Sequence, residues 1–113
     1  MKRLLTITAL ILVLSVPAFA LSDSEYKKFM KNADFAAADK ELTKAYKEAK
    51  KIMSKDDFEE LKEEQREWVK STRDEEAEEL IEEDGLSRVK AYTIVTLSRA
   101  SDLKKRVIYY VED

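Results

Sequence analysis

Apolar residues recur at intervals of three and four along most of the chain beyond residue 20, which is the period of one face of an α-helix. Ser22 and Glu25 have the spacing of a capping box and predict a short helix through residues 25–32. Asp34 is expected to cap a longer helix that continues to about residue 53. The stripe of this longer helix consists of Phe35, Ala38, Leu42, Ala45, Ala49 and Ile52.

Two more helices follow with the same period. Ser54 and Asp56 supply a turn and the cap of the second. Its stripe consists of Phe58, Leu61, Gln65, Trp68, Thr72 and Leu80. Gly85 is expected to end it, because glycine adopts the left-handed conformation at low cost. Ser87 can cap the third helix, whose stripe consists of Val89, Thr93, Thr96, Ala100, Leu103 and Val107.

The connections between these helices are only a few residues long, so consecutive helices should lie antiparallel. The residues beyond position 20 include one Gly and no Pro, and more than half of them are Ala, Glu, Lys, Leu or Arg. Such a composition is typical of helical bundles. The sequence therefore predicts an all-α fold, a small antiparallel up-down bundle of three main helices with a short extra N-terminal helix.

Antiparallel packing also predicts which residues face one another. With turns near residues 55 and 85, Trp68 lies opposite Leu42 and Leu103. A buried indole removes a large apolar area from water, so the spacing favours a core position for the only tryptophan. The alternative is that Trp68 faces a binding partner.

The same alignment places Asp39, Arg73 and Thr96 at one level of the bundle, with Arg99 one turn away. Asp39 and Arg73 both stand at the edge of an apolar stripe. A partly buried ion pair between them would add little net stability, but it would fix the register of the helices. In the alternative, Arg73 and Arg99 reach a ligand. The alignment also places Tyr46 near Gln65.

The first 20 residues have the pattern of a secretory signal. Lys2 and Arg3 precede an apolar run, and Ala18 and Ala20 are small residues at the positions that signal peptidase reads. The run has about 13 residues, whereas a membrane-spanning helix needs roughly 20. We therefore expect cleavage after Ala20, a mature chain that begins at Leu21, no stable membrane anchor, and export to the periplasm or the medium.

Charge and missing residue types narrow the function. The chain has 21 Lys+Arg and 24 Asp+Glu, and loss of residues 1–20 removes two basic residues and no acid, which leaves 19 against 24 and a net charge of about −5. This balance disfavours nucleic acid as a partner and permits a basic protein. With no His, no Cys and one Gly, the usual nucleophile–base pairs, zinc ligand sets and phosphate-binding loops are missing. We expect no catalytic residues, no metal site and no cofactor.

Residues 74–84, "DEEAEELIEED", contain eight acids and no base. They run to the C-terminal end of the second helix, where the helix dipole disfavours negative charge and successive acids repel one another. A basic protein partner could offset that cost. The alternatives are a solvated acidic face partly neutralised by Arg88 and Lys90, and weak cation binding. The candidate partner-binding residues are Glu75, Glu78, Glu79, Glu82 and Glu83.

Four segments, "ADKELTKAYK" (38–47), "EEQREWVKSTRD" (63–74), "GLSRVKAY" (85–92) and "TLSRASDL" (96–103), carry a family resemblance. In order and spacing the chain resembles the bacterial lysozyme-inhibitor family of the LprI N-terminal type. The motif residues are Asp39, Leu42, Tyr46, Gln65, Arg66, Trp68, Arg73, Asp74, Thr96 and Arg99.

The resemblance implies that residues 21–113 form a secreted helical domain, which in some members of the family inhibits lysozyme. It also marks two departures: members commonly carry paired cysteines, and Thr43 stands where the family's "LNxxY" element has asparagine. Lysozymes are commonly basic, so the resemblance and the charge agree. The expected function is non-covalent inhibition of a lysozyme; the alternative is a non-inhibitory structural or adaptor protein of the cell envelope on the same scaffold.

Overall fold

Residues 20–112 are described by the structure, a computed structural model, and they form helices and short connections without any strand. In chain order the elements are α2 (Asp23–Phe29), α3 (Ala33–Ile52), α4 (Lys55–Glu67), the π-helical turn η1 (Trp68–Thr72), α5 (Arg73–Asp84) and α6 (Arg88–Glu112). The predicted all-α fold is confirmed. The signal segment falls almost wholly on residues 1–19, outside the described residues.

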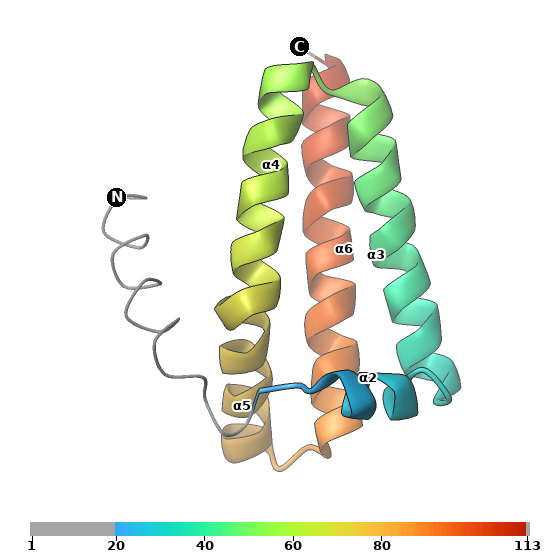
Figure 1. Cartoon of the computed structure of the whole chain (residues 1–113), viewed down its shortest axis with the longest axis vertical. Coiled ribbons are helices and arrows are strands. Elements are labelled where there is room, and N and C mark those ends of the chain that lie inside the picture. The colour runs from blue at the N-terminus through green and yellow to red at the C-terminus, as the bar shows by residue number, and fades with distance from the viewer. Residues whose placement is uncertain (1–19, 113) are drawn as a thin grey trace.

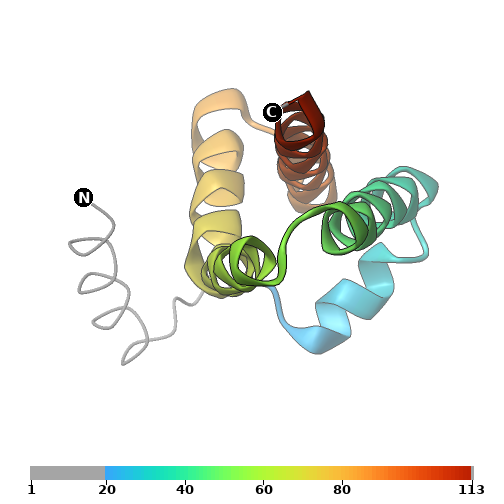
Figure 2. The same ribbon diagram turned by 90° about the horizontal axis from the view of Figure 1, so that it is seen from above.

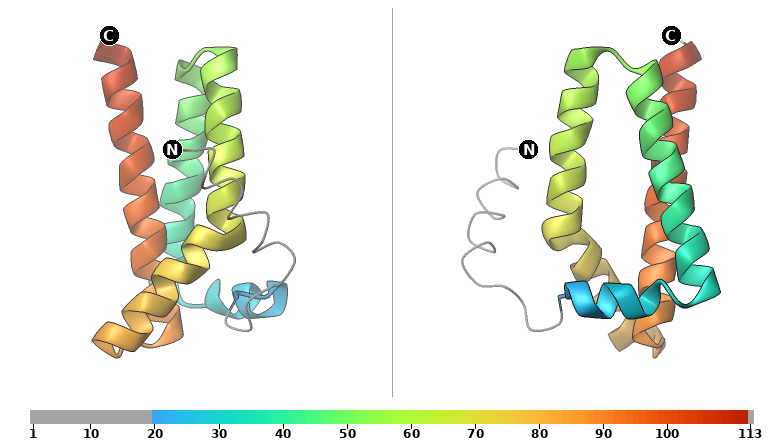
Figure 3. Two further views of the ribbon diagram at one scale, coloured as in Figure 1. Left: turned by 90° about the vertical axis from the view of Figure 1, so that its left-hand side faces the viewer. Right: turned by 45° about the vertical axis from the view of Figure 1, so that its right-hand side comes forward.

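The long helices run up, down and up, as expected for short connections (Figure 1). α3 and α6 lie side by side and form the main packing interface. α4 descends antiparallel to α3, and α2 lies across the lower end of the bundle (Figure 3). Seen from above, α5 extends sideways from the foot of α4 toward α6 (Figure 2). The acidic segment is thereby carried out of the line of α4.

Three of the predicted helix boundaries are confirmed by their hydrogen bonds. Of Ser54 and Asp56, it is Ser54 that caps α4: its Oγ accepts a hydrogen bond from the Asp57 amide at 3.2 Å, and Asp56 lies in the first turn. Gly85 ends α5 in the left-handed conformation with φ 68°, and its amide donates to the Ile81 carbonyl at 3.1 Å. Ser87 Oγ accepts from the Lys90 amide at 3.3 Å in the first turn of α6.

The two N-terminal boundaries differ in part from the prediction. Ser22 caps α2 by accepting from the Glu25 amide at 3.2 Å, as expected. Asn32, and not Asp34, caps α3: its side-chain oxygen accepts from the amides of Asp34 and Phe35 at 3.0 and 3.1 Å. Asp34 stands inside the first turn, where its negative charge still interacts favourably with the helix dipole.

The predicted second helix is interrupted by a π-helical turn. The Arg73 amide donates to the Trp68 carbonyl five residues back, so this turn holds one residue more than an α-helical turn would. The buried face consequently shifts along the sequence, from Phe58, Leu61 and Trp68 to Asp74 and Ala77. The expectation that Thr72 continues a single regular stripe was therefore wrong, whereas Leu80 is partly buried and packs against the core as expected.

One cluster of buried side chains forms the core, and it joins Leu42, Trp68 and Leu103 as predicted. α6 contributes more than its predicted stripe, because it is flanked by both α3 and α5 and buries a wider face. The additional buried residues of α6 are Ala91, Tyr92 and Val95. Ile52, at the end of the α3 stripe, is exposed.

Candidate functional site

Trp68 lies in the core at the start of the π-helical turn, with 6 % of its surface exposed. Two guanidinium groups flank its ring: the Cζ atoms of Arg73 and Arg99 lie 6.0 and 5.8 Å from the ring centroid. Cations at this distance are attracted to the electron-rich faces of an indole. The structural interpretation of Trp68 is therefore correct, and the partner-facing alternative is not.

These contacts belong to a longer alternation of cations and aromatic rings. Arg73 Cζ also lies 5.8 Å from the centroid of the Tyr92 ring, and Arg88 Cζ lies 5.5 Å from the same ring. We call these alternating side chains the cation–aromatic series; in spatial order they are Arg99, Trp68, Arg73, Tyr92 and Arg88. The series runs from α6 to η1 and α5 and back to α6, so it holds η1 and α5 against α6.

Arg99 is the polar anchor between α4 and α6, and its side chain is only 9 % exposed. Its Nε donates to Gln65 Oε1 at 2.8 Å, its Nη2 to Glu64 Oε1 at 3.0 Å and its Nη1 to Asp102 Oδ2 at 3.3 Å. Arg106 shares the carboxylates of Glu64 and Asp102. Burial alone would raise the pKa of Glu64, but the hydrogen bonds and charges of the two arginines outweigh it and lower that pKa.

The remaining α4 motif residue, Arg66, is exposed and pairs with Glu63 one turn away at 2.6 Å. Exposed pairs of this kind contribute little to stability. Tyr46 was expected near Gln65; the structure gives it a different partner, because its ring packs on Phe58 with centroids 5.2 Å apart. Gln65 itself is bonded to α6 through the arginine described above.

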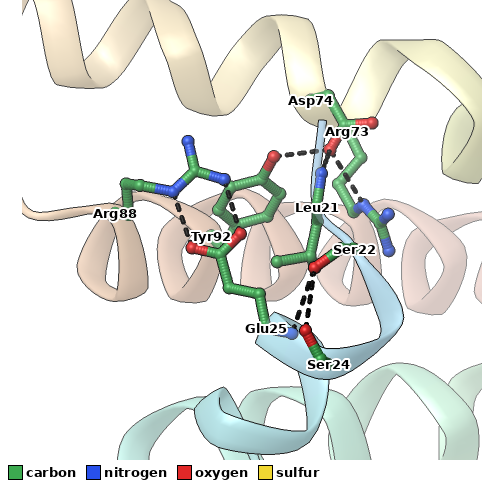
Figure 4. Close-up of polar contacts among 8 residues, drawn as sticks. All are labelled: Leu21, Ser22, Ser24, Glu25, Arg73, Asp74, Arg88 and Tyr92. Carbon is green, nitrogen blue, oxygen red and sulfur yellow. Dashed lines mark hydrogen bonds and ion pairs between the residues drawn. The ribbon is translucent and has the colours of Figure 1, made fainter. Parts of the chain in front are cut away.

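Asp74 is a buried carboxylate at the start of α5, with 3 % of its surface exposed. Its Oδ1 accepts hydrogen bonds from the Tyr92 hydroxyl and, at 3.1 Å, from the backbone N–H of Leu21 (Figure 4). Arg73 Nε lies 3.7 Å from the same oxygen and is itself buried, with no hydrogen-bond partner among residues 20–112. Burial, with the Asp74 bond and charge, raises the pKa of Tyr92 well above its usual range.

The predicted ion pair between Asp39 and Arg73 is not formed within the described residues; Arg73 pairs with Asp74. Asp39 faces Tyr26, whose pKa is raised by burial and by this carboxylate. The alignment counted residues as in a regular α-helix, whereas the π-helical turn displaces Arg73 by about one position. Thr96, the third residue expected at this level, is buried in α6.

Glu25 and Arg88 form a contact that the sequence did not indicate. Nε and Nη2 of Arg88 donate to the two carboxylate oxygens of Glu25, each at 2.8 Å, and tie α2 to α6 (Figure 4). This bond lowers the pKa of Glu25. The capping-box pattern pointed to a local role for Glu25, and Arg88 was considered only as a partial neutraliser of the acidic run, where the charge of Glu78 does help to raise the pKa of Arg88. Only the long-range fold brings the two together.

The acidic candidates gather on the outer side of α5. Glu75, Glu79, Glu82 and Glu83 are exposed and Glu78 is partly so. With Thr72 and Glu76 these residues line a surface hollow, which we call the acidic surface. Burial raises the pKa of Glu76, opposed by Arg99 and reinforced by the carboxylates of Glu79 and Glu75. Across residues 20–112, no group of His, Cys, Asp or Glu is arranged to hold a metal ion.

Most of the predicted site residues fall into two sets. Gln65, Trp68, Arg73, Asp74, Thr96 and Arg99 lie between the helices and contact one another or the core. The acidic surface is formed by α5 together with Thr72. Among the helices of the described part of the chain, none is both long and apolar enough to cross a membrane.

A family model described as "Lysozyme inhibitor LprI" matches residues 22–109. No curated protein matches the chain, and no solved structure does. The matched range begins at the cap of α2 and ends in the last turns of α6, so it covers every helix described above.

Proposed function

We propose that this chain, which belongs to the lysozyme inhibitor LprI family, is an exported protein that binds a lysozyme without covalent chemistry and thereby inhibits it. The observation that carries the proposal is the family match over residues 22–109. The acidic surface supports it, because a basic enzyme would be attracted to clustered carboxylates. Export is part of the proposal and rests on the signal pattern in the first 20 residues.

The acidic surface is the proposed contact with the enzyme. The bend at η1 turns α5 out of the line of α4 (Figure 3). Glu75, Glu79, Glu82 and Glu83 are exposed there and free to face a partner. Complementary charges at the rim of an interface chiefly raise the association rate. The contacts buried in the final complex chiefly determine the dissociation rate.

One observation favours a second candidate function, a structural or adaptor role in the cell envelope. Four of the motif residues, Trp68, Arg73, Asp74 and Arg99, are held inside the fold by contacts with one another and with Tyr92. Residues that are held inside the fold in this way determine the fold, and they do not determine which partner the protein binds. Proteins of the same fold could therefore bind different partners through different surfaces.

The two functions are separated by a cell-wall lysis assay. The purified chain beginning at Leu21 is added in increasing amounts to lysozymes of several types. We expect inhibition of at least one type that saturates with concentration and is reversed by dilution. If folded protein inhibits none of them, the adaptor function is favoured and inhibition by this chain is rejected.

Reversing the charge of Glu78, Glu79, Glu82 and Glu83 to lysine is expected to slow association with the inhibited lysozyme at least tenfold while changing dissociation much less. Rim charges act over the screening length, which is about 8 Å at physiological ionic strength. Added salt should therefore lower the association rate of the parent protein and leave that of the reversed variant nearly unchanged. Stopped-flow mixing over a series of salt concentrations measures both rates.

A matched control variant reverses Glu48, Glu59, Glu60 and Glu63, which are exposed on α3 and α4. It undergoes the same change in net charge at a different place, so it separates a local contact from the effect of overall charge. Circular dichroism confirms that both variants stay helical. Equal slowing in the two variants would show that the acidic surface is only a solvated face.

A further inference from the structure

The backbone nitrogen of Leu21 lies in front of a buried carboxylate that is 53 residues away in the sequence. It donates a hydrogen bond to Asp74 Oδ1 at 3.1 Å, and the Leu21 side chain packs against the core (Figure 4). Leu21 is also the residue at which the signal pattern places the start of the mature chain. The atom that cleavage would turn into an amino group is therefore already seated at an acidic site inside the fold.

Within the described part of the chain, no cation lies within hydrogen-bonding distance of Asp74. Two of its partners, the Tyr92 hydroxyl and the Leu21 amide, are neutral donors on the same oxygen. Its cationic neighbour, Arg73 Nε, is 3.7 Å away, beyond hydrogen-bonding distance, and Arg73 also faces the rings of Trp68 and Tyr92. A carboxylate as buried as Asp74 is costly unless positive charge and hydrogen bonds compensate for lost hydration.

We propose that Asp74 is the binding site for the α-ammonium group of the mature chain. Hydrolysis of the peptide bond between Ala20 and Leu21 consumes one water molecule, leaves a carboxylate on Ala20 and frees an amine on Leu21, which takes up a proton at neutral pH. The hydrogen bond from an amide to Asp74 thereby becomes an ion pair within the fold. Charge-assisted hydrogen bonds are roughly twice as strong as neutral ones, so removal of the signal stabilises the domain.

The proposal predicts how the stabilisation depends on pH. An α-amino group ordinarily has a pKa of about 7.7–8.0, and a buried carboxylate partner raises it. The pKa is then higher in the folded than in the unfolded state, so the contribution is complete below about pH 7.7 and is lost as the pH rises through the folded-state value.

Other ionisable groups around this position belong to all the elements that pack against it, and they must be held constant in any comparison. They are Glu25 and Tyr26 of α2, Asp39 of α3, Arg73 and Asp74 of α5, and Arg88 and Tyr92 of α6. A comparison of two chains that differ only at their first residue cancels the titration of these groups. The residue at which the chain begins is therefore the feature to vary in the experiment.

The experiment uses two chains, one beginning at Leu21 and one that retains Ala20, each with Asp74 and with the substitution Asp74→Asn. We expect the Leu21 chain to melt about 5 °C higher than the Ala20 chain at pH 6.5, a shift typical of one charge-assisted contact in a domain of this size. The difference should disappear in the Asp74→Asn background and at pH values above the folded-state pKa. Both chains retain a Leu21 nitrogen that can donate, so they differ only in the extra alanine and in the position of the charge.

An NMR titration of the Leu21 chain with a ¹⁵N-labelled leucine gives an independent readout that needs no substitution. We expect its α-amino group to titrate above pH 8. Equal melting temperatures for the two chains together with an α-amino pKa in the ordinary range would overturn the proposal. If the Asp74→Asn chains do not fold, the titration and the two parent melting temperatures still decide it.

Discussion

Replacing Trp68 with alanine is expected to lower the free energy of unfolding by about 3–5 kcal/mol, the usual cost of truncating a buried tryptophan. The indole is 6 % exposed and belongs to the core cluster that joins α3, α4 and α6. Its removal leaves a cavity and also takes away the ring that Arg73 and Arg99 face. A single domain has only about 5–15 kcal/mol to lose, so the variant should be partly unfolded at 37 °C.

Urea denaturation followed by circular dichroism measures this loss, since the variant has no tryptophan fluorescence. The control is Val69→Ala at the next position of η1, where the side chain is 43 % exposed. Both substitutions truncate an apolar residue of the π-helical turn, but only one opens the core. The control should change stability by less than about 1 kcal/mol. Similar losses in the two variants would contradict the assignment of Trp68 to the core.

Replacing Arg99 with alanine is expected to lower the free energy of unfolding by about 2–4 kcal/mol, because several side chains lose a hydrogen-bond partner at once. Gln65 loses its donor, and Glu64 keeps only the more exposed Arg106. Breaking a buried, hydrogen-bonded charge network costs much more than breaking a surface pair. Arg106→Ala is the matched control, because Arg106 contacts the same Glu64 and Asp102 but is 37 % exposed. It should cost less than about 1 kcal/mol.

The loss caused by Arg99→Ala should also depend on pH. The pKa of Glu64 is lowered in the folded protein, so its ion pairs stabilise the fold above the ordinary glutamate range and the contribution is lost as the pH falls through the folded-state pKa. The difference in stability between parent and variant should therefore begin to narrow below about pH 4.3, the ordinary pKa of glutamate, and should narrow further until the pH is below the folded-state pKa. Denaturation at pH 7 and at pH 3.5 measures the narrowing. An unchanged difference at both values would mean that Arg99 acts through packing alone.

The regular parts of the fold could be predicted from the sequence because each depends on a local rule. Ser54, Gly85 and Ser87 mark helix ends through hydrogen bonds or backbone conformations that involve only nearby residues. The stripe of α3 was equally clear, since its apolar residues recur without a gap. Asn32 was missed because both Asn and Asp are good caps, and only the three-dimensional structure shows which of them precedes the helix.

The π-helical turn could not be predicted, because the residues after Trp68 contain too few apolar positions to reveal a change of phase. In α5 only Ala77, Leu80 and Ile81 are apolar, and two neighbouring residues fit either register. The register error then propagated to Arg73, which was paired with the wrong carboxylate. Local rules place a helix well, but they do not determine its rotation about its own axis.

The sequence pointed to residues of the candidate site, but it did not show which of them contact one another. Spacing and alignment singled out Gln65, Trp68 and Arg73, and the resemblance added Arg66 and Asp74. In the structure Gln65, Trp68, Arg73 and Asp74 each contact a residue of α6 or belong to the core beside it, which explains why they occur together. The contacts of Leu21 and of Glu25 could not have been found by helix periodicity. They join an extended segment and a short helix to distant positions, and periodicity describes only neighbours within a helix.

The π-helical turn also makes the domain more sensitive to a change in length than to a change in composition. A substitution in η1 alters one side chain, whereas deletion of one residue there would restore a regular α-helix. Each α-helical residue advances the helix by about 100° of rotation, so the deletion would turn the whole of α5 by that angle relative to α4. Asp74 would then leave Tyr92 and Leu21, and the five acidic candidates would face another direction. Single-residue insertions and deletions between Trp68 and Thr72 should thus be tolerated far less well than substitutions at exposed Val69 or Lys70.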